Sequence, residues 1–329
     1  MNSSDRHGRI PALAAALLGG AFGAVTFAQT TPVVEQPVVI TVEVEDSVLY
    51  RGDIFDLAKL AKDPKPTTSV NTAFLTSVNV GDVRTLNGQP AKGIWSYQVL
   101  AMPFRANPQP GQAIADVDSS GLFQCIWQIV SPDGKYIGTL YDSGASPSPD
   151  HIVIGGSGAF RGMTGLHGAM EAVTPQRGAS TSEDPANRRI NGGGKLRIVF
   201  YLYPRSRPTV VTTPNGPAVV HADGKLVSNA NPAQAGEILT LYATGLGPTT
   251  PSVGFGQPFP QGAVALANAP VEVLVNGKPS GVLYAGGYPG AVDGYQVNFR
   301  LPAPLSQGNA GLQLTAAWIP GPEISIATK

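Results

Sequence analysis

The sequence has few charged residues and no excess of either sign. Only 13% of its 329 residues are charged, against about 25% in a typical soluble domain. This content is too low for a charged disordered tail or a long solvated helix. The 22 basic residues balance the 22 acidic residues, so net charge indicates neither nucleic acid nor an anionic membrane surface as a partner.

Cysteine is nearly absent, and no cluster of metal-ligating residues stands out. Cys125 is the single cysteine, which excludes an intramolecular disulfide and leaves stability to packing. Because it lies in the apolar run 122–130, we expect a buried, unreactive thiol. His151, His167 and His221 are spaced too widely for a recognisable zinc or triad pattern. The sequence therefore predicts no metal and no cofactor.

Long hydrophobic runs are missing except near the N-terminus. There, Arg6 and Arg9 precede an uncharged run from Ile10 to Val25, which small residues follow up to Ala28. This layout is typical of a secretory signal peptide over residues 1–28, and an N-terminal membrane anchor is the alternative. We expect a secreted or cell-envelope protein.

Glycine, proline and alternating strand patterns are abundant. The 40 glycines and 30 prolines make up about a fifth of the chain. From Val38 to Glu45 apolar and polar residues alternate, the period of a half-buried strand. Turn signals such as Asn87-Gly88 separate further runs of this kind. The remaining strands predicted before residue 205 are 95–100, 122–130, 136–141, 151–154, 166–173 and 195–203.

A second unit follows a proline-rich stretch, residues 206–217, that reads as a linker. Beyond it we predict strands at 237–243, 271–275, 294–301 and 312–318, with Asn276-Gly277 as a hairpin turn. The chain length also favours two domains. The spacing over residues 218–329 suits an immunoglobulin-like β-sandwich without its usual disulfide.

A glycine-rich turn carries a more specific signal. The residues from Ile152 to Gly162 read IVIGGSGAFRG, and a strand rich in Leu, Ile, Phe and Tyr closes this half at Tyr203. Together they resemble the allene oxide cyclase and dirigent barrel family. The resemblance implies an eight-stranded β-barrel over residues 33–205, an apolar pocket and assembly into homo-oligomers such as trimers. The turn itself needs only a structural role, and its residues are Gly155, Gly156, Ser157, Gly158, Phe160 and Gly162.

The second unit resembles an immunoglobulin-like C-terminal domain that is common in secreted proteins of soil bacteria. The residues that carry this resemblance are the segments 235–248, 271–277 and 295–302. No catalytic residues come with that family, so the resemblance implies a spacer or attachment module at the cell surface.

Two orientations of the barrel strands remain open. In the first, Arg197, Tyr201 and Tyr203 face the lumen, and Leu196, Ile198, Phe200 and Leu202 face outward. In the second, the two faces are exchanged. The first orientation supplies the candidate site, which consists of the ligand contacts Arg197, Tyr201, Tyr203, Trp95 and Tyr97 and the candidate catalytic carboxylates Glu43 and Glu45.

Two functions are compatible with this sequence. One is a binding or scaffold protein whose barrel holds an apolar small molecule. The other, which the family resemblance suggests, is a cofactor-independent cyclase, isomerase or stereochemical guide acting on a lipid-derived or phenolic substrate. A buried carboxylate with a raised pKa would favour the second.

Overall fold

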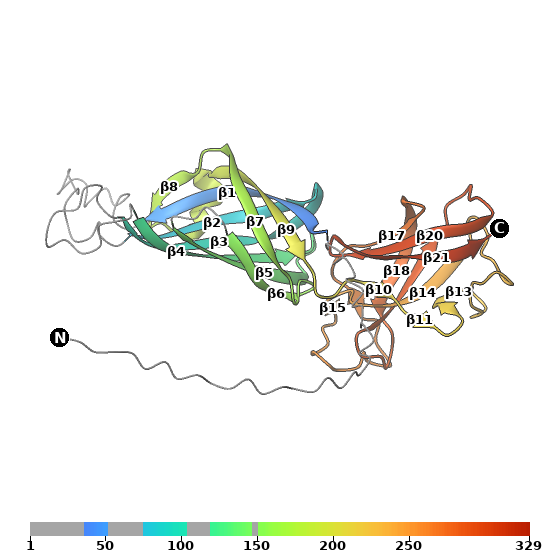
Figure 1. Cartoon of the computed structure of the whole chain (residues 1–329). Coiled ribbons are helices and arrows are strands. Elements are labelled where there is room, and N and C mark those ends of the chain that lie inside the picture. The colour runs from blue at the N-terminus through green and yellow to red at the C-terminus, as the bar shows by residue number, and fades with distance from the viewer. Residues whose placement is uncertain (1–35, 52–74, 104–118, 147–150) are drawn as a thin grey trace, which may run out of the picture. The chain divides into compact units, whose positions relative to one another are not determined.

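The computed structural model of the chain describes residues 36–51, 75–103, 119–146 and 151–329. The predicted signal peptide lies outside these ranges. Strands dominate the described residues, as the sequence predicted (Figure 1).

The first half of the chain forms a closed antiparallel barrel of eight strands, β1–β7 and β9. Each strand pairs with the next along the chain, β7 pairs with β9, and β9 and β2 both pair with β1, which closes the cylinder. The short β8 extends the sheet by pairing in parallel with the end of β1. The bounds are β1 Val38–Arg51, β2 Leu75–Leu86, β3 Gln89–Pro103, β4 Ser119–Val130, β5 Tyr136–Ser146, β6 His151–Gly158, β7 Thr164–Thr174, β8 Arg177–Ser180 and β9 Gly194–Tyr203.

Strand β2 was missed by the sequence prediction. Its alternation is interrupted at Gly81 and Asp82 in the middle of the strand. Contacts with residues distant in the sequence explain both. A Cβ on Gly81 would lie 2.4 Å from Cγ1 of Val44 on the neighbouring strand. Asp82 is buried and ion-paired with Arg188 and Arg189.

The glycine-rich turn connects β6 to β7. Gly158 and Gly162 have φ values of 62° and 75°, a region that favours glycine. Gly156 leaves room for Phe160, since a Cβ there would lie 2.2 Å from the Phe160 carbonyl oxygen. The Phe160 side chain is completely buried. These contacts account for the motif by backbone geometry and packing.

The C-terminal half forms further antiparallel sheets, compatible with a β-sandwich. The strand order is β10-β14-β19-β18-β17-β20-β21. The β17–β18 hairpin joins the first four strands to the last three. Asn276 and Gly277 form the predicted turn of that hairpin, with φ values of 51° and 73°. The main bounds are β14 Ile238–Thr244, β17 Val271–Val275, β18 Lys278–Gly287, β19 Gly294–Arg300, β20 Gly308–Ala316 and β21 Ile319–Thr328.

Short strands begin this half earlier than the sequence suggested. Within the predicted linker, β10 pairs with β14, and Val210 is buried in the C-terminal core. The short strands are β10 Thr209–Val210, β11 Thr212–Thr213, β12 Gly216–Pro217, β13 Val219–Val220, β15 Thr249–Thr250 and β16 Leu266–Ala267.

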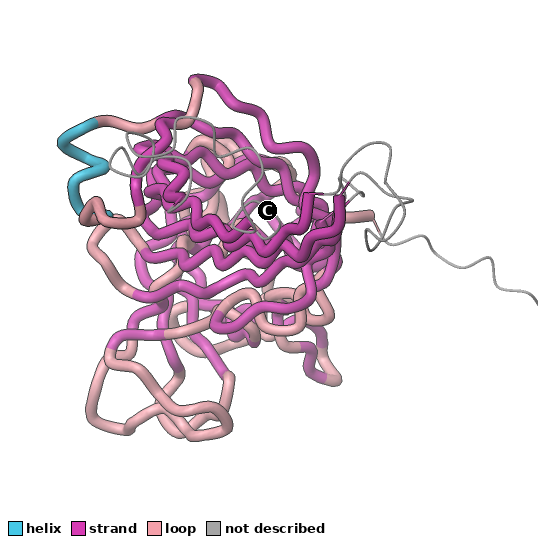
Figure 2. Tube along the Cα trace, turned by 90° about the vertical axis from the view of Figure 1, so that its left-hand side faces the viewer, coloured by secondary structure: helices cyan, strands magenta, loops and turns pink. Residues whose placement is uncertain are grey.

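Helix is confined to one short segment of the described residues, drawn in cyan in Figure 2. It comprises the 3-10 turn η2 (Pro185–Asn187) and α2 (Arg188–Asn191). Across the ranges that the structure describes, no helix has the length and apolar character needed to cross a membrane.

Candidate metal centre in the barrel lumen

The inner face of the barrel is set by β1 and β9. On β9 the alternate residues Leu196, Ile198, Phe200 and Leu202 are buried, so they fill the lumen. Of the two orientations that the sequence left open, the barrel therefore has the second. The larger apolar side chains take the interior because burying them releases the most nonpolar surface from water.

The candidate residues that depended on the first orientation lie outside. Arg197, Tyr201 and Tyr203 face outward on β9, and Tyr201 is 41% exposed. Their predicted place in the lumen is wrong, because their strand parity is opposite to that of the core residues. Glu43 pairs with Arg197 at 3.4 Å, and Glu45 pairs with Lys195 at 2.9 Å, on the same outer face.

Trp95 and Tyr97 do lie on the inner face of β3. Trp95 is fully buried and stacks on Trp127, with 5.5 Å between the ring centroids. Tyr97 is partly buried and stacks on Phe123 at 5.7 Å. These two predicted ligand contacts therefore belong to an aromatic wall of the lumen.

Beside this wall, four polar side chains meet inside the barrel. Cys125 (β4), Asp142 (β5), His151 (β6) and His167 (β7) each offer one ligand atom, and these atoms all lie within 4.8 Å of one another. Cys125, Asp142 and His167 are buried, and the His151 side chain is 13% exposed. The sequence showed no zinc or triad spacing among these histidines, yet the fold brings His151 and His167 together. His221 lies elsewhere, paired with Glu237.

Strand register brings the four residues together. Cys125 is directly opposite Asp142 across β4 and β5, and His151 is directly opposite His167 across β6 and β7. Residues opposite one another in antiparallel strands have Cβ atoms about 4.5–5.5 Å apart and point to the same face. Four neighbouring strands thus each supply one inward polar group.

The Asp142 carboxylate is the centre of the cluster. Its Oδ1 lies 3.1 Å from Nδ1 of His151 and 3.3 Å from Nδ1 of His167. Its Oδ2 accepts a 2.6 Å hydrogen bond from Nε1 of Trp127. Burial alone would raise the pKa of Asp142, but the hydrogen bonds from His151 and His167 outweigh it and hold the pKa well below its usual range. Asp142 therefore links three side chains inside the barrel.

Cys125 completes the cluster, with Sγ 3.9 Å from Nδ1 of His151. Burial is the largest cause that raises the pKa of this thiol, and the nearby Asp142 carboxylate raises it further. A cation in the cluster would reverse this effect, because a coordinated thiol is deprotonated.

Two buried nitrogen atoms of the lumen lack a partner. His167 Nε2 and Trp95 Nε1 have no hydrogen-bond acceptor or donor among the described residues. An unsatisfied buried polar group costs about 1–3 kcal/mol. The protein therefore keeps costly polar atoms beside the cluster, where packing alone would favour apolar side chains.

The donor set fits a transition-metal ion. Zinc–ligand bonds are about 2.0–2.3 Å long, which places the ligand atoms of a tetrahedral site about 3.3–3.6 Å apart. Three of the six separations between the cluster's ligand atoms, 3.1, 3.3 and 3.9 Å, lie near this range, and all six are within 4.8 Å. Thiolate and imidazole suit zinc and copper, whereas magnesium and calcium prefer an all-oxygen site.

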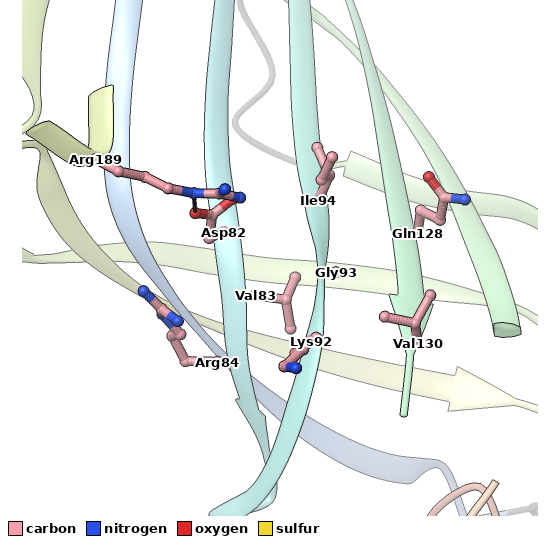
Figure 3. Close-up of a pocket in the computed structure, with 9 residues that line it drawn as sticks. All are labelled: Asp82, Val83, Arg84, Lys92, Gly93, Ile94, Gln128, Val130 and Arg189. Atoms are coloured by element: carbon pink, nitrogen blue, oxygen red, sulfur yellow. Dashed lines mark hydrogen bonds and ion pairs between the residues drawn. The ribbon is translucent and has the colours of Figure 1, made fainter. Parts of the chain in front are cut away.

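A separate hollow of about 510 Å³ lies on the outer face of β2–β4 (Figure 3). Arg189 reaches Asp82 within it, and Arg84 pairs with Glu45 at 3.1 Å. Burial would raise the pKa of Asp82, but hydrogen bonds from Arg189 and Arg188 lower it. The Asp82 pairs attach α2 to β2, and the Arg84–Glu45 pair joins β2 to β1, so these charges have structural roles.

The outer face also carries a row of apolar residues. Ile152, Leu166, Tyr201 and Val39 are consecutive cross-strand neighbours on β6, β7, β9 and β1, and each is between 41% and 56% exposed. Leu196, Ile198, Phe200 and Leu202, which would face outward in the first orientation, are inside the barrel instead. The predicted homo-oligomer stays a prediction.

Comparison with known protein families and with curated proteins finds no match to the chain. The eight-stranded barrel agrees with the fold that the glycine motif implied. Membership of the allene oxide cyclase and dirigent family, and the immunoglobulin-like identity of the C-terminal half, stay predictions.

Proposed function

We propose that the protein is a metal-binding protein whose barrel holds one transition-metal ion at Cys125, Asp142, His151 and His167. The observation that carries this proposal is the convergence of four ligand atoms within 4.8 Å in the lumen. A thiolate, a carboxylate and two imidazoles supply a donor set typical of zinc-class ions.

The surroundings of the cluster support the proposal. Trp127 holds the Asp142 carboxylate through Oδ2, as the outer-shell partners of metal ligands do, and this leaves Oδ1 directed at the two histidines. The Trp127 and Phe200 side chains beside it are fully buried. They limit access of water, which strengthens electrostatic attraction between a cation and Asp142.

The test uses the full chain after its metal has been removed with a chelator. Zn²⁺ titration followed by calorimetry and elemental analysis should give one bound ion per chain. At a free concentration of 100 times the dissociation constant, bound zinc stabilises the folded barrel by about 2.7 kcal/mol. A chain that binds no stoichiometric zinc, copper or nickel would refute the proposal.

Ligand variants make the test specific. His151→Ala, His167→Ala and Cys125→Ser should each weaken zinc binding by at least tenfold, with circular dichroism confirming the fold. His221→Ala is the matched control, because His221 also pairs with a carboxylate but lies outside the cluster. Equal loss in the control and the ligand variants would contradict the assignment.

A second candidate function is the binding of an apolar or planar small molecule, as the sequence suggested. Stacked rings of Tyr97, Phe123 and His151 favour it, since their centroids are 5.5–5.8 Å apart and Tyr97 and His151 are only partly buried. Native mass spectrometry with solvent extraction of the purified protein tests it. A stoichiometric organic passenger would support this function. The predicted enzyme would need a buried carboxylate with a raised pKa. Glu43 and Glu45 face solvent, and the pKa of the buried Asp142 is lowered.

A further inference from the structure

The donor set of the lumen cluster selects among metals. Of the four ligands, one is a thiol sulfur and two are imidazole nitrogens, and Asp142 supplies the fourth through Oδ1. One cysteine and two histidines are the three main ligands of copper sites that transfer electrons, and here a carboxylate would take the place of the usual weak fourth ligand. We propose that the site holds copper and exchanges one electron at a time, Cu(II) + e⁻ ⇌ Cu(I). This inference rests on the proposed metal-binding function.

The barrel holds these donors on a rigid frame. Each ligand comes from a different one of four consecutive strands, β4 to β7, and the register fixes Cys125 against Asp142 and His151 against His167. Cu(I) and Cu(II) prefer different coordination geometries, so a frame that cannot rearrange makes electron exchange fast. A site on loops would not provide this constraint.

A buried hydrogen-bond donor lies where it would tune a copper–sulfur bond. Trp95 Nε1 is buried without a partner among the described residues. Trp95 is the diagonal cross-strand neighbour of Cys125 on the inner face, because Tyr97 lies opposite Cys125. A copper-bound thiolate would give this N–H an acceptor. Hydrogen bonds and apolar packing around the sulfur set the reduction potential of such sites.

One ligand lies nearer to solvent than the others. The His151 side chain is 13% exposed, against 2% for His167 and 0% for Asp142. Its ring stacks on Phe123, with an interplanar angle of 10°, and on Tyr97. Electrons would therefore enter and leave through the His151 edge.

The experiment adds Cu(II) to the full metal-free chain and records visible absorption and electron paramagnetic resonance spectra. We expect an intense sulfur-to-copper charge-transfer band at one copper per chain. Ascorbate should bleach it by supplying one electron, and ferricyanide should restore it by removing one, over repeated cycles. Cys125→Ser should abolish the band while the histidines still retain Cu(II).

Trp95→Phe provides a second variant that keeps every ligand. It should shift the midpoint potential downward with copper binding retained, because it removes a donor that stabilises the electron-rich reduced site. Gln98→Ala, an exposed change on the outer face of the same strand, should leave the potential unchanged.

Three results with added copper would overturn the inference. They are Cu(II) binding without a thiolate band, oxidation of Cys125 in place of reversible cycling, and a Trp95→Phe potential equal to that of the natural chain. Zinc binding without copper cycling would overturn this inference and leave the proposed metal-binding function intact. Failure to bind any of these metals would refute both.

Discussion

The barrel and the C-terminal sheets are built from the same kind of strand but differ in what they bury. In the described part of the C-terminal half, the buried polar side chains are two threonines, Thr249 and Thr328, and each donates to a backbone carbonyl. The described barrel half buries the charged groups Asp82, Arg188 and Asp142. The described barrel half therefore buries charge, whereas the described C-terminal half buries only neutral polar groups.

The two buried charge clusters of the first half have different roles. Asp82 is matched by Arg188 and Arg189, and together they attach a short helix to the barrel. Asp142 fastens no element of this kind, and it lies among strands that already pair with one another. Burying a charge is costly unless it is paired. A buried carboxylate that attaches no further element and is shared by two histidines and a tryptophan indicates a functional site.

Truncating one buried phenylalanine in each region tests whether the two hydrophobic cores are equally well packed. These changes have the largest expected effect. Phe200 in the barrel and Phe299 in the C-terminal core are both fully buried. Phe200→Ala and Phe299→Ala should each lower the free energy of unfolding of their own region by about 4 kcal/mol through lost burial and a cavity. Hydrogen exchange resolved by strand measures both. A loss below about 2 kcal/mol in one region alone would show that its packing is looser.

Replacing Asp142 with leucine tests whether the barrel depends on its buried carboxylate. Asp142→Leu leaves the Nδ1 atoms of His151 and His167 and the indole N–H of Trp127 without their shared acceptor. The metal-free barrel should lose about 3 kcal/mol of stability, measured by the same exchange experiment. Asp223→Asn, which changes an exposed carboxylate, is the control and should have no measurable effect. If the stability of the metal-free barrel did not change, the four side chains of the cluster would not form a coupled hydrogen-bond network.

The histidine of the C-terminal half should respond to pH. His221 Nδ1 lies 2.6 Å from Glu237 Oε1, and Nε2 lies 3.1 Å from the Asn231 carbonyl oxygen. Burial lowers the pKa of His221, but these two bonds outweigh it and raise the pKa above its ordinary value. The pair therefore stabilises the fold fully below about pH 6.5, and this stability is lost as pH rises through the raised pKa.

Unfolding measured from pH 5 to pH 9 checks the direction of this effect. The change should be no more than about 1 kcal/mol, since solvent screens the pair. His221→Ala should remove the pH dependence that this pair contributes, and stability that increases with pH in the difference between the two chains would contradict the assignment.

The smallest effect is expected on the outer face of the barrel. Arg197 lies 3.4 Å from both Glu43 and Glu171, and its side chain is 44% exposed. Arg197→Gln should change stability by less than about 0.5 kcal/mol and should leave zinc and copper binding unchanged. Weakened metal binding in this variant would show that the outer face communicates with the lumen.

The sequence by itself determined the fold class and most of the strands. Alternation of apolar and polar residues identified β1, β4 and β9, and Asn-Gly pairs marked two hairpin turns, because both signals depend only on neighbouring residues. Strand β2 escaped detection, since Gly81 and Asp82 are explained only by Val44 and by two arginines more than 100 residues further along the chain.

Only the tertiary structure decided which strand face is inside and which polar residues meet. Arg197 and Leu196 alternate identically whichever face is buried, so pattern alone left the lumen undefined. Cys125, Asp142, His151 and His167 are up to 42 residues apart in the sequence, and no local spacing links them. They converge because four consecutive antiparallel strands place residues of the same parity on one inner face, and the closure of the barrel fixes their register.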